Sequence, residues 1–435
     1  MQRTAPGALF LALALVVLFA APGHAGSQNA GGKLQLVIYL NRHGVRSPTG
    51  KSDRNDVYSS SAWPKWNVAP GYLTAHGFEL MKLLGAYDRA ELAQEGLLAS
   101  SGCSDAADVT ILADSDERTR QTGKALAEGL FPTCPPAVHA LPEDDPDPLF
   151  HSMHAGVGKP DRALAQAAIE GRIGGSAANL TEAYRPQLEA LDRVLAGCGK
   201  APVTNAQRKS IFDVPVENAQ GKSDHAADLH GPLPVASSMA ETLLLEYTND
   251  VKGADLGWGC LDEAKLRQIM QLHTASVEYT ERTPAVARME ASNLLAHIVG
   301  ALEQSAAGKP QAGALGAPGD HVLFLVGHDT NIATVSGMLH LDWILDGRAD
   351  DTPPGGALVF ELWRSPEGDD SVRVYYTAQT LDQMRDSTPL TLADPPERVP
   401  IFVPGCSRAD MSCSLEGFAA TARRVIDPAF VVTQP

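Results

Sequence analysis

The chain runs Leu34-Gln35-Leu36-Val37-Ile38-Tyr39-Leu40-Asn41 and then Arg42-His43-Gly44-Val45-Arg46-Ser47-Pro48-Thr49-Gly50. The first segment is short, almost continuously apolar and rich in β-branched and aromatic residues, which is typical of a buried strand in a parallel sheet. Two arginines around one histidine follow it at once. In open α/β sheets, ligands bind in the crevice beyond the carboxyl ends of the strands. The two segments together predict an α/β fold with a ligand site at residues 42–50.

The residue types in this segment indicate phosphate chemistry. Arg42 and Arg46 stay charged and can each donate several hydrogen bonds to an oxyanion. Like charge on both sides lowers the pKa of His43, so its ring is neutral and nucleophilic. The alternative is that the arginines meet surface carboxylates and that His43 is a hydrogen-bonded loop residue. The complete RHGxRxPT string directly after a strand favours attack of the imidazole on a bound phosphate.

A second strand is predicted at residues 108–113, and Asp114-Ser115-Asp116-Glu117-Arg118 follows it. A helix then continues to Phe131 and stops at Pro132. Arg118 falls in the first helical turn, where a cation is unfavourable beside the helix dipole unless an anion also binds there. We therefore interpret Arg118 as a third phosphate-binding arginine. The alternative is a surface ion pair with Asp114 or Glu117.

A third strand is predicted at residues 321–326, followed by Gly327-His328-Asp329 and a helix over 332–339. His328 can donate to a phosphate oxygen, and Asp329 can stand beside the leaving oxygen. Because the carboxyl ends of parallel strands meet at one edge of a sheet, the three strand ends are expected to converge on one crevice.

The rest of the chain divides around these strands. Residues 26–143 and 311–435 are expected to form the α/β domain, with further paired strands at 357–363 and 372–379. Residues 144–310 have a mainly helical pattern and predict an inserted helical subdomain. Residues 1–25 have a basic start, an apolar run and small residues ending at Ala25, as in a secretory signal peptide. The apolar run is shorter than a membrane span needs, so a periplasmic or secreted protein is predicted.

Charge and cysteine content fit an exported enzyme. The formal net charge of -17 makes nucleic acid and anionic membranes poor partners. The six cysteines suggest three disulfides in an exported chain. Cys406 with Cys413 would close a short loop, and Cys103 with Cys134 would bracket one strand–helix unit. Cys198 and Cys260 are the remaining pair, and their pairing is the least secured by the sequence.

Several other histidines are interpreted as structural. Thr74 is a suitable N-cap for a helix, and His76 at the start of that helix is given a structural role. His151 and His154 have ligand-like spacing, but the sequence places no acidic partner beside them. We therefore interpret both as ordinary loop histidines.

With RHGVRSPT at 42–49 and GHDTN at 327–331, the chain resembles the histidine acid phosphatases, the second branch of the histidine phosphatase superfamily, and among them the secreted bacterial phytases and acid phosphatases. Segments 113–120, 351–360 and 383–386 share the resemblance. It implies a mainly parallel sheet flanked by helices, of the phosphoglycerate-mutase-like kind. It also implies that neither a metal nor a cofactor is needed.

The resemblance also assigns expected roles to individual residues. His43 would be the nucleophile that becomes phosphohistidine, and Asp329 would be the proton donor. The expected phosphate-binding residues are Arg42, Arg46, Arg118 and His328. Thr49 would contact the substrate, and Glu241 matches more loosely an acid on the substrate side of the helical domain.

The expected activity is that of an acid phosphatase, with phytate as the leading substrate. The protein is expected to be a monomer whose only partner is a small phosphate ester. A glucose-1-phosphatase or another sugar-phosphate phosphatase is the alternative, and a non-catalytic anion-binding protein is a third possibility. Thr330 and Asn331 favour a phytase. Gly50 stands where relatives active on phytate often carry lysine, and six cysteines stand where close relatives often have eight.

Overall fold

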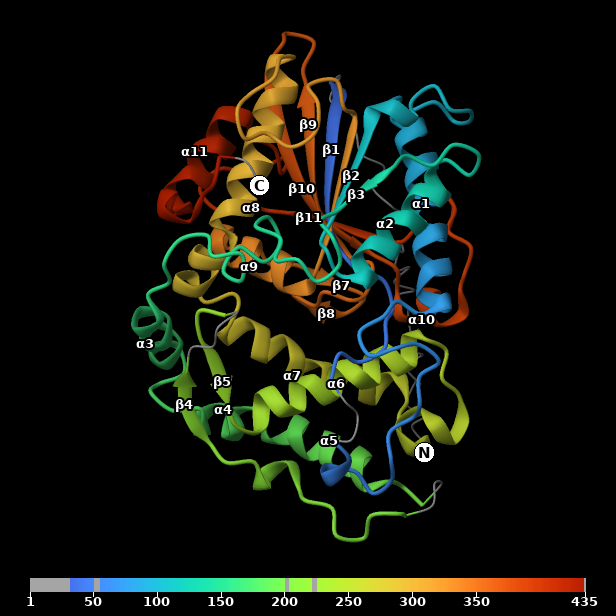
Figure 1. Ribbon diagram of the computed structural model, residues 1–435, viewed down its shortest axis with the longest axis vertical. Helices are drawn as coiled ribbons and strands as arrows, with labels where there is room; N and C mark the ends of the chain where they lie inside the picture. Colours follow the sequence, from blue (N-terminus) through green and yellow to red (C-terminus); the bar gives the residue numbers. More distant parts are fainter. Residues whose placement is uncertain (1–31, 51–54, 200–202, 221–224, 434–435) are drawn as a thin grey trace, which may run out of the picture.

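The structure is a computed structural model that describes residues 32–50, 55–199, 203–220 and 225–433. The expected signal peptide, residues 1–25, lies outside the described residues. Figure 1 shows two parts, a β-sheet flanked by helices and a mainly helical region packed against one end of that sheet.

The sheet has the strand order β11-β10-β9-β1-β6-β2-β3, and β12 pairs with β10. Its parallel half consists of β1 (Lys33–Arg42), β6 (Val322–Gly327), β2 (Val109–Ala113) and β3 (Val138–His139). Its antiparallel half consists of β9 (Ala357–Arg364), β10 (Asp370–Ala378), β11 (Glu397–Ile401) and β12 (Cys413–Ser414). The expected α/β class with helices on both faces is confirmed, and the parallel half carries the three predicted strand ends.

Helices cover both faces of the central strand β1. Leu36, Ile38 and Leu40 share one buried cluster with residues of α8 (Pro284–Ala307), α9 (Asp329–Leu339) and α11 (Leu415–Val425). Val37 and Tyr39 share another with residues of α1 (Ala75–Gln94) and α2 (Glu117–Leu130). Because both faces are buried, the strand sequence is apolar almost throughout, as in other sheets covered on both sides.

Two glycines let α1 and α2 approach each other closely. A Cβ atom on Gly85 would lie 2.4 Å from the Leu126 carbonyl oxygen, and one on Gly129 would lie 2.2 Å from the Lys82 carbonyl oxygen. Both distances are far inside van der Waals contact. The backbones of the two helices therefore touch at this crossing. This contact fixes the position of α2, and of Arg118 in its first turn, relative to the sheet.

The helical region has its own buried core. This core is formed mainly by α3 (Arg162–Arg172), α4 (Ala178–Ala183), α5 (Arg185–Ala196), α6 (Pro232–Thr248) and α7 (Glu263–Tyr279). The region also contains a short antiparallel pair, β4 (Glu217–Gln220) with β5 (Asp228–His230), which the sequence pattern did not predict. The domain limits of 144–310 stay a prediction. In the structure α8, which falls inside those limits, packs on the sheet.

Short elements complete the chain. They are β7 (Ile344–Leu345), β8 (Arg348–Ala349), α10 (Leu381–Asp386) and the 3-10 turns η2 (Asp56–Tyr58), η3 (Ala106–Asp108), η4 (Ile211–Asp213), η5 (Gly253–Gly259) and η6 (Pro428–Phe430). The three expected disulfides are present, Cys103–Cys134, Cys198–Cys260 and Cys406–Cys413. Within the described ranges, no helix is both long enough and apolar enough to cross a membrane.

Candidate active site

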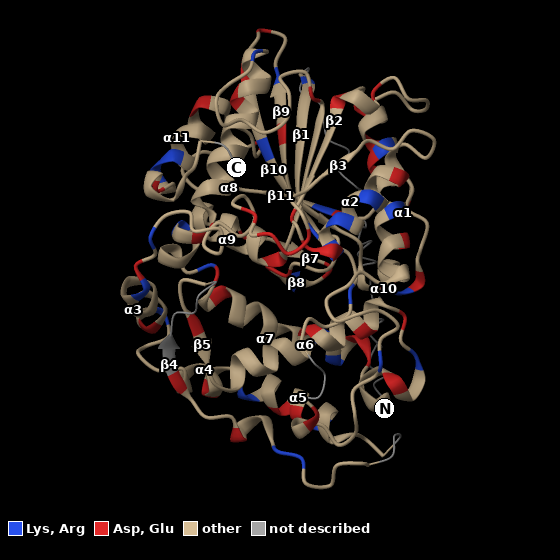
Figure 2. Ribbon diagram, in the orientation of Figure 1, with Lys and Arg blue, Asp and Glu red and all other residues tan. Residues whose placement is uncertain are grey.

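The three predicted strand ends lie side by side. Arg42, the last residue of β1, pairs in register with Gly327 of β6, and Ala113 of β2 pairs with Val326 of the same strand. Figure 2 shows acidic and basic residues gathered where these strands end, next to the helical region. The convergence expected from the sequence is therefore confirmed.

His43 is buried and its tautomer follows from its neighbours. Its Nδ1 lies 2.9 Å from the carbonyl oxygen of Gly44, which only accepts, so Nδ1 carries the hydrogen. The lone pair is then on Nε2, 3.4 Å from the Nε of Arg46. Burial, together with the charges of Arg118 and Arg46, lowers the pKa of His43 well below its usual value. The lowered pKa keeps the ring neutral, as the sequence predicts, and the role of His43 as a nucleophile stays a prediction.

Arg42 is fully buried and held by several acceptors. It donates to the Thr352 carbonyl oxygen and pairs with Glu241, and its Nη2 lies 3.2 Å from Asp329 Oδ2. Burial works against the charge, but Asp329 and Glu241 outweigh it and raise the pKa of Arg42. Arg42 therefore remains a cation inside the protein.

Arg46 and Arg118 stand around the same space. The Arg46 Nη2 lies 3.6 Å from Glu241, and burial lowers the pKa of Arg46 to about 10. Arg118 lies in the first turn of α2, where its Nη2 is 3.4 Å from His328 Nδ1. Arg118 does form an ion pair, at 2.5 Å, but with Asp116 rather than with the partners considered from the sequence.

His328 is buried at the start of α9, and two neighbours fix it. Its backbone N–H donates to Asn331 Oδ1 at 2.9 Å, and its Nε2 lies 2.6 Å from Asp114 Oδ2. Asn331 also donates to the Phe150 carbonyl oxygen at 2.7 Å, which ties the loop before His151 to this helix start. Burial, with Arg118 and His151, lowers the pKa of His328, although the hydrogen bond to Asp114 opposes the shift.

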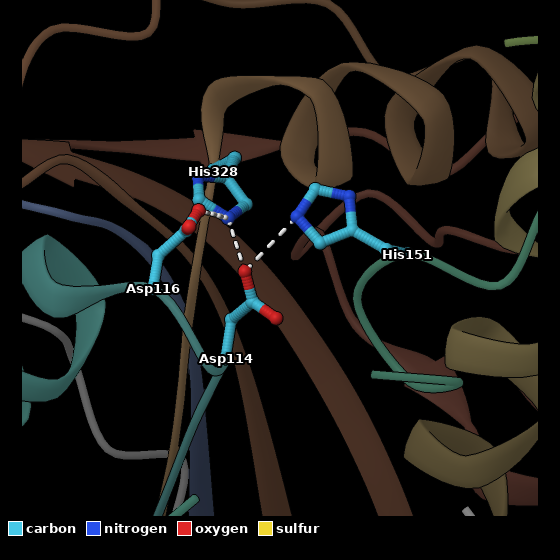
Figure 3. A group of neighbouring side chains, drawn as sticks. All are labelled: Asp114, Asp116, His151 and His328. Carbon is cyan, nitrogen blue, oxygen red and sulfur yellow. Dashed lines mark hydrogen bonds and ion pairs between the residues drawn. The ribbon is translucent and has the colours of Figure 1, made fainter. Parts of the chain in front are cut away.

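His151 and Asp114 belong to the site, and the sequence did not reveal this. Asp114 Oδ2 lies 3.0 Å from His151 Nε2 as well as against His328, as Figure 3 shows. Burial favours the neutral acid, but hydrogen bonds from both histidines outweigh it and lower the pKa of Asp114. The interpretation of His151 as an ordinary loop histidine is therefore wrong. The available signal was Asp114 itself, a carboxylate placed directly after a buried strand.

Asp329 and Glu241 face each other across the buried arginine, and His273 of α7 stands between them. The His273 Nε2 lies 3.8 Å from Glu241 Oε2 and 4.0 Å from Asp329 Oδ2. Burial alone would raise the pKa of Asp329, but Arg42 and His273 outweigh it and lower that pKa. Asp329 is thus a carboxylate beside Arg42. No sequence pattern indicated His273 as part of the site, because it lies on a helix of the helical region.

A cavity of about 230 Å³ adjoins these residues. Arg46 and Glu241 line it on the side of His43, and the exposed Thr49 and Gly50 line it further out, with Trp63 and Trp66 among the other lining residues. Thr49 therefore lines the cavity, and its expected contact with a substrate stays a prediction. His76 lies apart from the cavity and keeps a structural role, with Nε2 2.8 Å from the Met384 carbonyl oxygen.

Two groups of side chains have the composition of a metal site. They are Asp114, Asp116, His151 and His328, and Glu241, His273 and Asp329, with ligand atoms within 4.8 Å in each group. In both groups guanidinium groups already supply positive charge, because Arg118 pairs with Asp116 and Arg42 pairs with Glu241 and Asp329. These contacts favour proton and anion chemistry, and we assign no metal to either group.

Comparison with known proteins agrees with this geometry. Residues 33–377 match the model of the histidine phosphatase superfamily, branch 2. Phytase AppA of Escherichia coli K12 is 39% identical over 91% of this chain and 93% of its own length, and a glucose-1-phosphatase of Providencia rettgeri is 29% identical over 94% and 95%. The structure of Hafnia alvei phytase in complex with tartrate superposes with a TM-score of 0.85 at 34% identity, covering 93% of this chain and 99% of that one. The chain therefore belongs to branch 2 of the histidine phosphatase superfamily.

Proposed function

We propose that this enzyme is an acid phosphatase that hydrolyses phosphomonoesters, with phytate as its substrate, through a phosphohistidine at His43. The observation that carries the proposal is the neutral His43. Its Nε2 keeps the ring lone pair and accepts only a long hydrogen bond, 3.4 Å, from Arg46 Nε, and three arginines around the ring help to lower its pKa. A neutral imidazole within a ring of cations is suited to attack phosphorus while the cations balance the phosphate oxygens.

In the first step, His43 Nε2 forms a bond to phosphorus and the bond between phosphorus and the ester oxygen breaks. Arg42, Arg46 and Arg118 compensate the charge on the phosphate oxygens. Asp329 gives its proton to the leaving oxygen. In the second step, Asp329 takes a proton from a water molecule that attacks phosphorus. The bond to His43 breaks, and inorganic phosphate leaves.

Asp329 must hold a proton for the first step, although Arg42 and His273 lower its pKa. A bound phosphate would compete for the charge of Arg42, which lies 3.2 Å from Asp329, and so would raise the pKa of the acid. Acidic solution works in the same direction. The proposal therefore includes an acidic range of activity.

Phytate is the first choice of substrate because the most similar relatives reported above are phytases, at 34% and 39% identity. The cavity beside Arg46 extends past Thr49 and Gly50 and can receive a substrate larger than its one reacting phosphate. Glucose 1-phosphate is the second candidate, favoured by the glucose-1-phosphatase relatives at 27% and 29% identity.

We also propose that the enzyme is exported and acts as a monomer. All six cysteines are paired in disulfides, which form in oxidising compartments. One chain supplies every residue of the site described above.

The decisive experiment is a quench of the wild-type enzyme with ³²P-labelled substrate in alkaline detergent, because phosphohistidine is acid-labile. Label is expected on His43, located by peptide mapping, and His43→Ala should show neither label nor turnover. A substrate panel of phytate, glucose 1-phosphate and an aryl phosphate, with and without a chelator, ranks the substrates. Near-normal turnover by His43→Ala would refute the mechanism, and anion binding without hydrolysis of any ester would indicate a binding protein.

A further inference from the structure

Two histidines share one buried carboxylate beside the proposed phosphate site. Asp114 is fully buried, and its Oδ2 lies 2.6 Å from His328 Nε2 and 3.0 Å from His151 Nε2 (Figure 3). The two imidazole rings lie 4.8 Å apart. A single carboxylate can compensate only one positive charge, so protonation of one ring opposes protonation of the other.

The state of His328 decides whether it can hold a phosphate. Its Nε2 donates to Asp114, and its Nδ1 accepts a long hydrogen bond, 3.4 Å, from Arg118 Nη2, so Nδ1 is the nitrogen that would face an anion bound beside Arg118. An imidazole ring that donates from both nitrogens is an imidazolium. In this geometry, His328 can therefore donate to a substrate phosphate only while it carries its extra proton.

The surrounding charges make the protonation of His328 depend on the charge of His151. Other charged or titratable groups also face the two histidines. They lie after β1, at the start of α2, in the loop before His151 and on α9, and they are His43, Asp116, Arg118, Asp147 and Asp329. Arg118 opposes a further positive charge on either ring. Burial lowers the pKa of His328, whereas for His151 the hydrogen bond to Asp114, together with the charges of Asp114 and Asp116, outweighs burial and raises the pKa. His151 therefore takes the first proton, and its 37% exposed side chain can exchange that proton with solvent.

We propose that His151 is a positioning residue that competes with His328 for Asp114 and thereby sets the upper pH at which His328 donates to the substrate phosphate. The inference rests on the proposed phosphatase function. It does not require His151 to touch the substrate. It assigns to this histidine a role in the pH range of the enzyme.

Three variants separate this role from a structural one. His151→Gln removes the competing charge but keeps an N–H donor for Asp114, whereas His151→Lys makes the competing charge permanent. His154→Gln is the matched control, since His154 is an exposed histidine three residues further along the same loop. The first two variants should have opposite effects on His328, and the control should have none.

The direct measurement is NMR titration of the ¹⁵N-labelled His328 ring in the substrate-free protein. The midpoint is expected to rise in His151→Gln and to fall in His151→Lys. This measurement does not depend on catalysis. A midpoint that stays the same in both variants would overturn the inference, even if the enzyme hydrolyses phosphate esters as proposed.

The second measurement is kcat/KM for an aryl phosphate as a function of pH. We compare kcat/KM of His151→Gln with that of wild type at two pH values, on the acid plateau and one pH unit above the alkaline midpoint of wild type. The ratio of the two kcat/KM values should be at least about threefold larger at the higher pH, which corresponds to a shift of about half a pKa unit. The same ratio for His151→Lys should fall. A ratio that stays constant with pH in both variants would mean a structural role only. Absence of hydrolysis by the wild type would instead count against the proposed function.

Discussion

The Nη2 of Arg42 and the Oδ2 of Asp329 lie 3.2 Å apart. Arg42 ends β1, and Asp329 begins α9, just after the neighbouring strand β6. One guanidinium thus faces both the space for the phosphate and the proposed proton donor. Any anion that draws on the charge of Arg42 weakens its hold on the Asp329 carboxylate. Substrate binding and loading of the acid with a proton are therefore coupled through a single side chain.

Replacement of Asp329 by asparagine should separate the two chemical steps. The amide neither donates the proton to an alkoxide nor accepts one from water, so kcat/KM for phytate should fall about 10²- to 10⁴-fold. An aryl phosphate has a leaving group that needs little protonation, so this variant should release one equivalent of the aryl alcohol in a burst before slow turnover. Stopped-flow absorbance measures the burst, and Asp369→Asn, on an exposed loop, is the control. Equal loss on both substrates with no burst would contradict the role.

Removal of Arg118 should weaken phosphate binding specifically. Arg118→Ala takes away a cation beside His328 and should lower kcat/KM about 10²-fold or more, mainly through KM and through a larger Ki for inorganic phosphate. Arg120→Ala is the matched control, since Arg120 lies two residues along the same helix with a side chain 42% exposed. Steady-state kinetics with phosphate as inhibitor measure both variants. Equal Ki values for the two would argue against a phosphate contact.

Glu246 should make the protein more stable in acid than in base. It is fully buried on α6, and burial raises the pKa of its carboxyl from 4.5 to about 8. Because the folded-state pKa lies above the unfolded one, stability is lost as the pH rises from about 4.5 to about 8. Glu246→Gln should raise Tm at pH 8 by at least about 3 °C and flatten this part of the curve. Calorimetry from pH 5 to pH 8 tests this, with the exposed Glu189→Gln as control. An unchanged slope would show that Glu246 is already solvated.

The crossing of α1 and α2 should not tolerate a single methyl group. Gly85→Ala would place a Cβ 2.4 Å from a backbone oxygen of α2 and should destabilise the protein by about 1–3 kcal/mol. Gly171→Ala in α3 has no atom within 4 Å of the new Cβ and should stabilise by about 0.5–1 kcal/mol. Denaturant unfolding compares the two. Similar effects from both would mean that helix propensity, rather than the crossing, decides.

The sequence revealed those parts of the site that follow strands directly. Arg42, Arg118 and His328 are a few residues beyond three apolar runs, and parallel pairing brings such positions together by geometry alone. The paired strands at 357–363 and 372–379 were also predicted and are confirmed as β9 and β10. The local sequence pattern was sufficient for these two strands, because β9 is buried along its length and β10 alternates between buried and partly exposed residues.

The sequence could not reveal contacts made across the fold. His151 lies in a loop and His273 on a helix of the other region, and nothing near either of them in sequence indicates Asp114 or Asp329 as a neighbour. The loop is brought into place by Asn331, through a bond to the Phe150 carbonyl oxygen. Likewise the packing of α8 on the sheet depends on which face of that helix is covered, and a helical pattern alone does not say whether that face meets the sheet or the helical region.

The position of β1 in the sheet means that this strand pairs, on both of its sides, with segments that are synthesised much later than itself. Val37 pairs with Val322 on one side and with Glu361 on the other, so both neighbours of this strand come from the last third of the chain. A ribosome adds them long after His43 has emerged. A nascent polypeptide that ends before β9 carries the complete RHGVRSPT sequence but has no second edge for its strand and no assembled catalytic centre. Pairing of β1 on both sides is therefore a long-range closure, of the kind that makes folding slow.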